Sequence, residues 1–178
     1  TGASPRTWSR SEFAAGDLAL FDVVDDPLAA TAAPSQWIVN EAEGRKVAAE
    51  INAAHPGAAL FLTQDVRDET RWQEVIAETV KAFGGLHVLV NNAGVVKIAT
   101  PESCTLDEFR FQNAVMSEGV FLGCKHAIPA MKDSGGGSII NMSSVASHLG
   151  YPVYFAYSAA KGAVRSMTKS IAVHAQMN

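Results

Sequence analysis

The 178-residue sequence has few of the features that mark several common classes of protein. Its two cysteines, Cys104 and Cys124, lack the paired spacing of a zinc or redox motif, so we expect reduced structural thiols. No run approaches the roughly 20 apolar residues of a membrane span. The N-terminus also lacks the basic-then-apolar pattern of a secretory signal. We therefore expect a soluble cytoplasmic protein without a membrane partner.

Positive charge is sparse and does not cluster. The chain has 14 Lys and Arg residues against 18 Asp and Glu, a net charge of −4, so nucleic acid is not an expected partner. The five histidines share no metal-ligand spacing such as His-x-x-x-His, and we expect no metal site. His148 alone lies near the candidate site described below, where it is either a solvated loop residue or a substrate contact.

Apolar residues make up 48% of the chain, enough for one substantial core and, at this length, for a single domain over residues 1–178. Short apolar runs alternate with segments in which apolar residues recur every three or four positions. This alternation predicts a doubly wound parallel sheet in a three-layer α/β/α arrangement. The expected strands are 18–21, 58–62, 86–90 and 138–143, and the expected helices are 41–54, 68–83, 105–131 and 155–173, with an inserted loop over 23–39. The helix 68–83 carries an apolar stripe from Trp72 to Phe83, and Thr105 and Glu108 form a capping box at the start of the next helix.

The stretch from Ser144 to Lys161 carries the clearest chemistry. If a helix begins near Phe155, Tyr157 and Lys161 stand four positions apart on one face. An adjacent ammonium moves the pKa of a phenol down from about 10, so that the tyrosine can pass a proton to or from a carbonyl oxygen. Ser144 follows the strand 138–143, at the sheet edge where open α/β proteins bind ligands. We expect its hydroxyl to hydrogen-bond the same substrate oxygen.

Two other strand ends are candidate cofactor contacts. The expected strand 86–90 leads into Asn91-Asn92-Ala93-Gly94, whose last two residues let a cofactor lie close to the backbone, although a structural turn is the alternative. Asp22 stands directly at the end of the expected strand 18–21. An acidic side chain there accepts hydrogen bonds from the adenosine ribose and repels a 2′-phosphate, which favours NAD over NADP. Asp22 can instead be a turn or capping residue, and Asp25 and Asp26 compete for the role.

Together, Asn91 to Gly94, Ser144 and Tyr157-Ser-Ala-Ala-Lys161 resemble the classical short-chain dehydrogenase/reductase family, from about Leu18 to Ala175. The resemblance implies a Rossmann fold and hydride transfer between NAD(P) and a secondary alcohol or ketone. It implies that Tyr157 is the acid/base, that Ser144 polarises the substrate oxygen, and that Lys161 lowers the pKa of the tyrosine and holds the nicotinamide ribose. The further cofactor contacts that it implies are Gly2, Asp65, Val66, Asn91, Ala93 and Gly94, with a loop cap as the alternative for Asp65.

Some positions depart from the family pattern. Arg6 and Trp8 occupy the second and third glycine positions of its phosphate-binding turn. Met116 stands where the family has a catalytic asparagine, three residues before Gly119, and Ser117 or Asn113 is the candidate substitute.

Relative to the family, we expect the fold to be incomplete at both termini, without the first strand and without the Pro-Gly element after the last helix. Two hypotheses follow. The chain is an NAD(P)-dependent oxidoreductase, or it is a degenerate, inactive relative that retains the fold and the oligomer interface. In both, the two long helices are predicted to pair with their equals in a homodimer or homotetramer.

Overall fold

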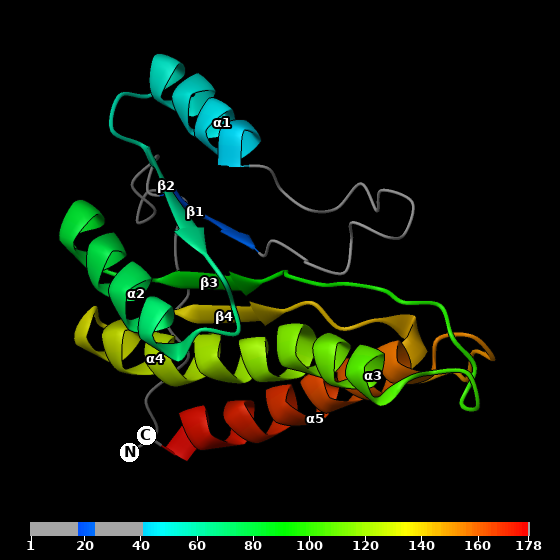
Figure 1. Ribbon diagram of the computed structural model, residues 1–178. Helices are drawn as coiled ribbons and strands as arrows, with labels where there is room; N and C mark the ends of the chain where they lie inside the picture. Colours follow the sequence, from blue (N-terminus) through cyan, green and yellow to red (C-terminus); the bar gives the residue numbers. More distant parts are fainter. Residues whose placement is uncertain (1–17, 24–40, 178) are drawn as a thin grey trace.

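The computed structural model describes residues 18–23 and 41–177 (Figure 1). Several positions that the sequence singles out lie outside these ranges. They are Gly2, Arg6, Trp8, Asp25, Asp26 and all of the expected loop 23–39 except Val23.

Helices and strands alternate along the described chain, as predicted. The elements are β1 (Leu18–Val23), α1 (Glu41–Ala54), β2 (Ala59–Gln64), α2 (Glu69–Phe83), β3 (Val88–Asn91), α3 (Leu106–Asn113), α4 (Gly119–Asp133), β4 (Ser138–Asn141) and α5 (Phe155–Met177), with a π-helical turn η2 (Ala114–Glu118) and a short 3-10 helix η3 (Val145–Ser147). The helix predicted over 41–54 agrees to the residue, and the strand ends differ from the prediction by at most two residues.

The described strands pair in parallel. β1 pairs with β2, with Leu20 opposite Phe61, and β3 pairs with β4, with Leu89 opposite Ile139. The predicted parallel arrangement is therefore confirmed. The described strands nevertheless form two pairs rather than one sheet, because no ladder of hydrogen bonds joins β1 to β3 in the described part of the chain.

Alternate side chains of β2 meet helices on opposite faces. Gly44 of α1 lies so close to the ring of Phe61 that a Cβ there would collide with it, and the Arg45 guanidinium lies 5.4 Å from the ring centre. The next residue, Leu62, is buried in the core with Trp72 of α2. Helices thus cover both faces of the strand pair, which is the doubly wound, three-layer arrangement (Figure 1).

The sequence of α2 sets both its ends and its buried face. Asp68 caps the first turn by accepting a hydrogen bond from Arg71 N at 3.1 Å. Gly84 ends the helix with φ at 81°, a left-handed conformation that side chains disfavour. The predicted apolar stripe is buried at Trp72, Val75, Ile76 and Thr79.

The predicted long helix is present as α3, η2 and α4 in direct succession. The capping box is confirmed, with Glu108 N donating to Thr105 Oγ1 at 3.2 Å and Thr105 N donating to Glu108 Oε2 at 3.0 Å. The π-helical turn was not predicted. Its bond from Gly119 N to Ala114 O spans five residues, and it holds Met116 fully buried. Such turns are frequent at functional sites.

Two further observations concern the described residues only. None of their helices combines the length and apolar character needed to cross a membrane. Nor do three or more His, Cys, Asp or Glu side chains among them gather where a metal ion could be held.

Candidate active site

Two hydrogen bonds fasten the chain after β4 to the helix α5. Lys161 Nζ donates to Met142 O at 2.6 Å, and Ser143 Oγ donates to Lys161 O at 3.0 Å. Ser144 follows directly, so it lies next to the turns of α5 that carry Tyr157 and Lys161. The structure thereby brings together the segment and the helix on which the three predicted catalytic residues stand.

The hydroxyl of Ser144 keeps its proton available. The residue has an extended backbone and begins η3, where its Oγ accepts a hydrogen bond from Ala146 N at 3.2 Å. No acceptor for the hydroxyl proton lies among the described residues. Ser144 can therefore donate to an oxygen of a ligand.

Lys161 is a buried cation, 5% exposed, and this burial lowers the pKa of its ammonium. Its Nζ lies 5.8 Å from the centre of the Tyr157 ring. An ammonium has three N–H donors, and the hydrogen bond to Met142 O uses one of them. Across from it, a Cβ added at the exposed Gly94 would lie 3.7 Å from Nζ, so bare backbone faces the cation.

Asn91 is tied into the protein rather than turned outward. Its Nδ2 donates to Asn141 Oδ1 at 2.8 Å and to Cys124 Sγ at 3.6 Å, and its carbonyl accepts from Met142 N at 3.0 Å. A Cβ at Gly123 of α4 would collide with Asn91 Oδ1, so glycine is needed for this approach. In the structure Asn91 acts as the anchor from which Ala93 and Gly94 extend.

The carboxylate of Asp65 is already paired. Arg67 Nη2 lies 2.6 Å from Asp65 Oδ2, and Arg67 N donates to Asp65 Oδ1 at 2.9 Å. Burial alone would raise the pKa of Asp65, but the hydrogen bonds from Arg67 outweigh it and hold that pKa below its usual value. The neighbouring Val66 is buried, and its carbonyl accepts from Trp72 Nε1 at 2.9 Å. Asp65 thus accepts the hydrogen bond expected of a loop cap, and its contact with a cofactor stays a prediction.

Asp22 lies within β1, opposite Thr63, because the strand runs two residues further than predicted. Position 22 is thus part of the strand pair rather than the loop that follows it.

Neither candidate substitute for the missing asparagine reaches Lys161. Ser117 Oγ donates to Asn113 Oδ1 at 3.2 Å and to Ala160 O at 3.4 Å. Asn113 Nδ2 donates to Phe109 O at 2.8 Å within its own helix. Met116 offers only its thioether, which a Cβ at Gly94 would approach to 3.8 Å. The side chains of Asn113 and Ser117 therefore form hydrogen bonds with partners other than Lys161.

Apolar side chains surround the site. The ring of Tyr154 lies 6.0 Å from that of Tyr157 and 5.8 Å from that of Tyr151, so the three tyrosines form a row. Ala99 N donates to Val153 O at 2.9 Å and joins the segment after Gly94 to this loop. Further large apolar side chains here are exposed: Val145, Leu149, Tyr151, Val153 and Phe155. His148 is also exposed, as a solvated loop residue would be.

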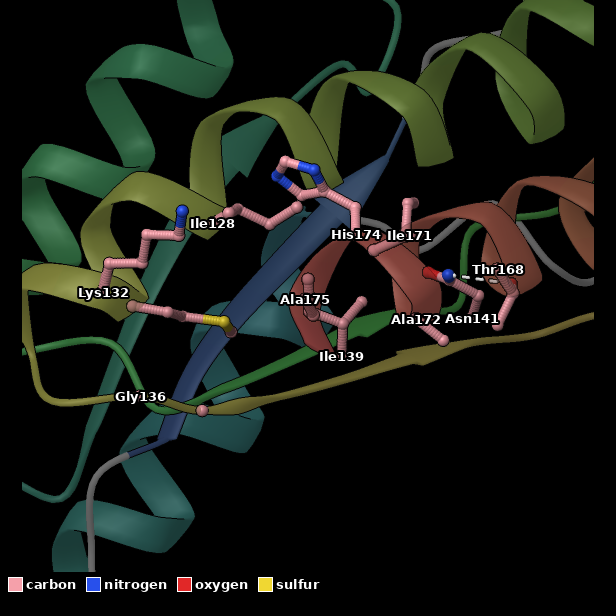
Figure 2. A pocket seen from close by; sticks show the side chains of 12 residues that line it. Ile128, Lys132, Gly136, Ile139, Asn141, Thr168, Ile171, Ala172, His174 and Ala175 are labelled. Atoms are coloured by element: carbon pink, nitrogen blue, oxygen red, sulfur yellow. Dashed lines mark hydrogen bonds between the residues drawn. The ribbon is translucent and has the colours of Figure 1, made fainter. Parts of the chain in front are cut away.

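A hollow of about 400 Å³ lies elsewhere, among α4, β4 and the C-terminal half of α5 (Figure 2). Its lining is mostly apolar and includes Ile128, Ile139 and Ile171. Asn141 and Thr168, joined by a hydrogen bond of 3.0 Å, lie at one end of it in Figure 2. None of the predicted catalytic residues lines this α4–α5 hollow, so it is distinct from the candidate site.

The chain is a parallel α/β protein in which Tyr157 and Lys161 lie together on α5. The chain belongs to the short chain dehydrogenase family, whose model matches residues 30–178. The Rossmann-like α/β fold expected from the sequence is the fold of this family.

Relatives with assigned activities are similar over most of the chain. It is 41% identical over 135 residues to a 3-beta-hydroxysteroid dehydrogenase of Comamonas testosteroni, covering 76% of this chain and 51% of the relative. It is 43% identical over 138 residues to a trans-4-hydroxycyclohexanecarboxylate dehydrogenase of Sinomonas cyclohexanicum, covering 75% and 53%. An NADP-dependent (R)-specific alcohol dehydrogenase of Lentilactobacillus kefiri is 43% identical over 114 residues, covering 64% and 45%. The chain spans about half the length of the curated relatives it matches.

Proposed function

We propose that the protein is an NAD(P)-dependent oxidoreductase that interconverts a secondary alcohol and a ketone, with Tyr157 as the acid/base. The observation that carries the proposal is the buried ammonium of Lys161, which lies 5.8 Å from the Tyr157 ring centre and is hydrogen-bonded to Met142 O, two residues before Ser144. A positive charge next to a phenol favours the charge that develops on oxygen during proton transfer. Ser144 supports the same oxygen, because its hydroxyl retains a free proton to donate.

A nicotinamide dinucleotide fits the described groups at its ribose end. Lys161 has two N–H donors left after Met142 O, and Gly94 presents backbone without a side chain opposite them. We propose that Lys161 holds the ribose hydroxyls and that Ala93 and Gly94 lie along the cofactor. When bound, the cofactor supplies the hydride acceptor or donor. We favour NAD over NADP because residue 22 is acidic, with Gly2, Asp65 and Val66 as the further cofactor contacts that the family resemblance suggests.

The substrate that we propose is an alicyclic secondary alcohol or its ketone. Exposed apolar side chains at Val145, Leu149 and Val153 and the tyrosine row offer such a ring an apolar surface to pack against. Two of the relatives named above are dehydrogenases of ring alcohols, a hydroxysteroid and a hydroxycyclohexanecarboxylate.

For assembly, we propose a homodimer or homotetramer formed through α4 and α5. Phe121 of α4 is 50% exposed and Val173 of α5 is 58% exposed, which leaves apolar surface on both helices. A cytoplasmic location stays a prediction from the sequence.

The decisive experiment is a fluorescence titration of the 178-residue chain with NADH, with Tyr157→Phe as the matched variant. We expect saturable binding in the micromolar range for both proteins. Oxidation of cyclohexanol-type substrates should fall about 10²- to 10⁴-fold in Tyr157→Phe, the usual contribution of a general acid/base. If a demonstrably folded chain does not bind NADH, the oxidoreductase proposal fails, and the degenerate relative that keeps only fold and interface replaces it.

A further inference from the structure

Gln112 is a fully buried amide, and one of its two hydrogen bonds leads out of its own helix. It stands in the last turn of α3, directly before the π-helical turn. Its Oε1 accepts a hydrogen bond from Lys97 N at 3.1 Å, while its Nε2 makes a longer bond of 3.4 Å to Glu108 O. A buried amide is costly unless it is hydrogen-bonded, so the bond to Lys97 is the interaction that accounts for a polar residue here.

Lys97 belongs to the segment 92–99, which links the two halves of the candidate site. At its start lies Gly94, opposite Lys161 Nζ. At its end Ala99 N donates to Val153 O at 2.9 Å, in the loop that carries the tyrosine row. Within the described chain, the backbone N–H bonds recorded from this segment are those of Lys97 and Ala99. Gln112 therefore accepts one of these two backbone hydrogen bonds.

We propose that Gln112 is a positioning residue that sets Gly94 against Lys161 and, through Ala99, holds the loop of the tyrosine row in register with it. The inference rests on the proposed function. Lys97 lies three residues after Gly94 and two before Ala99, so release of its N–H lets both ends of the segment shift. Binding of cofactor and of substrate should weaken together.

Neighbouring residues cannot take over this role. Asn113 is bonded to Phe109 O in its own helix. Met116, one turn further on and also buried, offers only a thioether, which is a weak acceptor. The tie to Lys97 N needs an oxygen acceptor, which Gln112 provides.

The test compares Gln112→Met, which keeps the shape and removes the acceptor, with Gln112→Glu, which keeps an acceptor oxygen. Amide hydrogen exchange measures the protection of Lys97 N–H by residue 112 without any cofactor. It is carried out at mildly acidic pH, where a buried carboxyl group stays protonated. We expect Lys97 N–H exchange to rise at least tenfold in Gln112→Met, with α2 and β3 unchanged and Gln112→Glu near the parent. NADH dissociation constants and KM for substrate should rise about tenfold in Gln112→Met, with kcat changed less than threefold.

Three outcomes would overturn the proposal. They are unchanged exchange of Lys97 in Gln112→Met, a rise in exchange spread over the whole chain, and a local rise with NADH affinity and KM unaltered. Absence of NADH binding in the parent chain is a different result. It would contradict the proposed function, while the exchange rate of Lys97 N–H would still report on its hydrogen bond to Gln112. Asn113→Leu serves as the control, since the bonds lost there, to Phe109 O and from Ser117 Oγ, stay within α3 and η2, and it should leave Lys97 exchange unchanged.

Discussion

The ammonium of Lys161 lies 2.6 Å from the carbonyl oxygen of Met142, the residue that follows β4. This bond joins the end of a strand to the middle of α5, and it does so with a cation that is 5% exposed. Burying a charge beside one neutral acceptor costs stability, since water solvates an ammonium better. The protein therefore keeps a group here that stability alone does not favour, as is typical of functional sites.

Lys161→Met should stabilise the fold and weaken cofactor binding. At neutral pH we expect the free energy of unfolding to rise by about 0.5–2 kcal/mol and NADH affinity to fall at least tenfold. Burial lowers the pKa of Lys161, so between that lowered pKa and its usual value the unfolded chain binds more protons. Stability of the parent should then rise with pH across this interval, and the rise should be smaller in Lys161→Met. Urea denaturation at neutral and alkaline pH measures both effects. A loss of stability in the variant would contradict the prediction.

Ser143→Ala and Ser144→Ala form a matched pair of adjacent hydroxyl deletions. Ser143 Oγ donates to Lys161 O, so its loss should lower the free energy of unfolding by about 1 kcal/mol. Ser144 keeps its proton for the substrate oxygen, so Ser144→Ala should lower kcat about 10²- to 10³-fold, as for loss of an oxyanion donor. Thermal unfolding and steady-state rates of both variants separate the two roles. Equal losses of rate in the two variants would argue against a specific role for Ser144.

Local sequence signals predicted the elements and the pairing of Tyr157 with Lys161. The capping box of Thr105 and Glu108 and the spacing of four between Tyr157 and Lys161 act within one or two helical turns. Backbone geometry alone then fixes which side chains meet. The strands were predicted from their short apolar runs, and Ser144 was placed at the ligand-binding edge because the carboxyl ends of parallel strands meet there.

Other features depend on contacts between distant residues, which no local pattern encodes. The five residues of η2 are ordinary helix formers, so nothing in them signals a π-helical turn. The inward direction of Asn91 depends on Gly123 and Asn141, 32 and 50 residues away. The bond from Lys97 to Gln112 spans 15 residues and joins a loop to a helix interior. Each becomes visible only once the helices and strands are packed.

Met116→Asn, which restores the residue typical of the family, should destabilise this chain. Met116 is fully buried, and the side chains of Asn113 and Ser117 already have partners. The smaller amide would leave a cavity and unsatisfied polar atoms, at a cost of about 2–4 kcal/mol. Met116→Leu is the control and should cost less than about 1.5 kcal/mol. Chemical denaturation measures the difference. A stable Met116→Asn variant with faster turnover would show instead that the turn accommodates the asparagine.

Thr168→Val should destabilise the protein while leaving NADH affinity almost unchanged. Thr168 Oγ1 accepts from Asn141 Nδ2 at 3.0 Å and donates to Val164 O at 2.8 Å. Valine has the same shape but leaves the Asn141 amide without that acceptor. Both residues line the α4–α5 hollow, where water can reach the amide, so we expect a cost near the low end, about 1 kcal/mol.

The same variant tests how far Asn91 depends on α5. Asn91 Nδ2 binds Asn141 Oδ1, the other atom of that amide, and this bond survives in Thr168→Val. NADH affinity should therefore change less than about threefold, whereas Asn141→Leu, which removes the partner of Asn91, should lower stability by a further 1–3 kcal/mol or so and weaken NADH binding. Thr168→Ser keeps the hydroxyl and should match the parent in the hydrogen bond to Asn141. A tenfold loss of NADH affinity in Thr168→Val would mean that the amide of Asn141 turns when its α5 partner is lost, and that α5 helps to hold Asn91 in place.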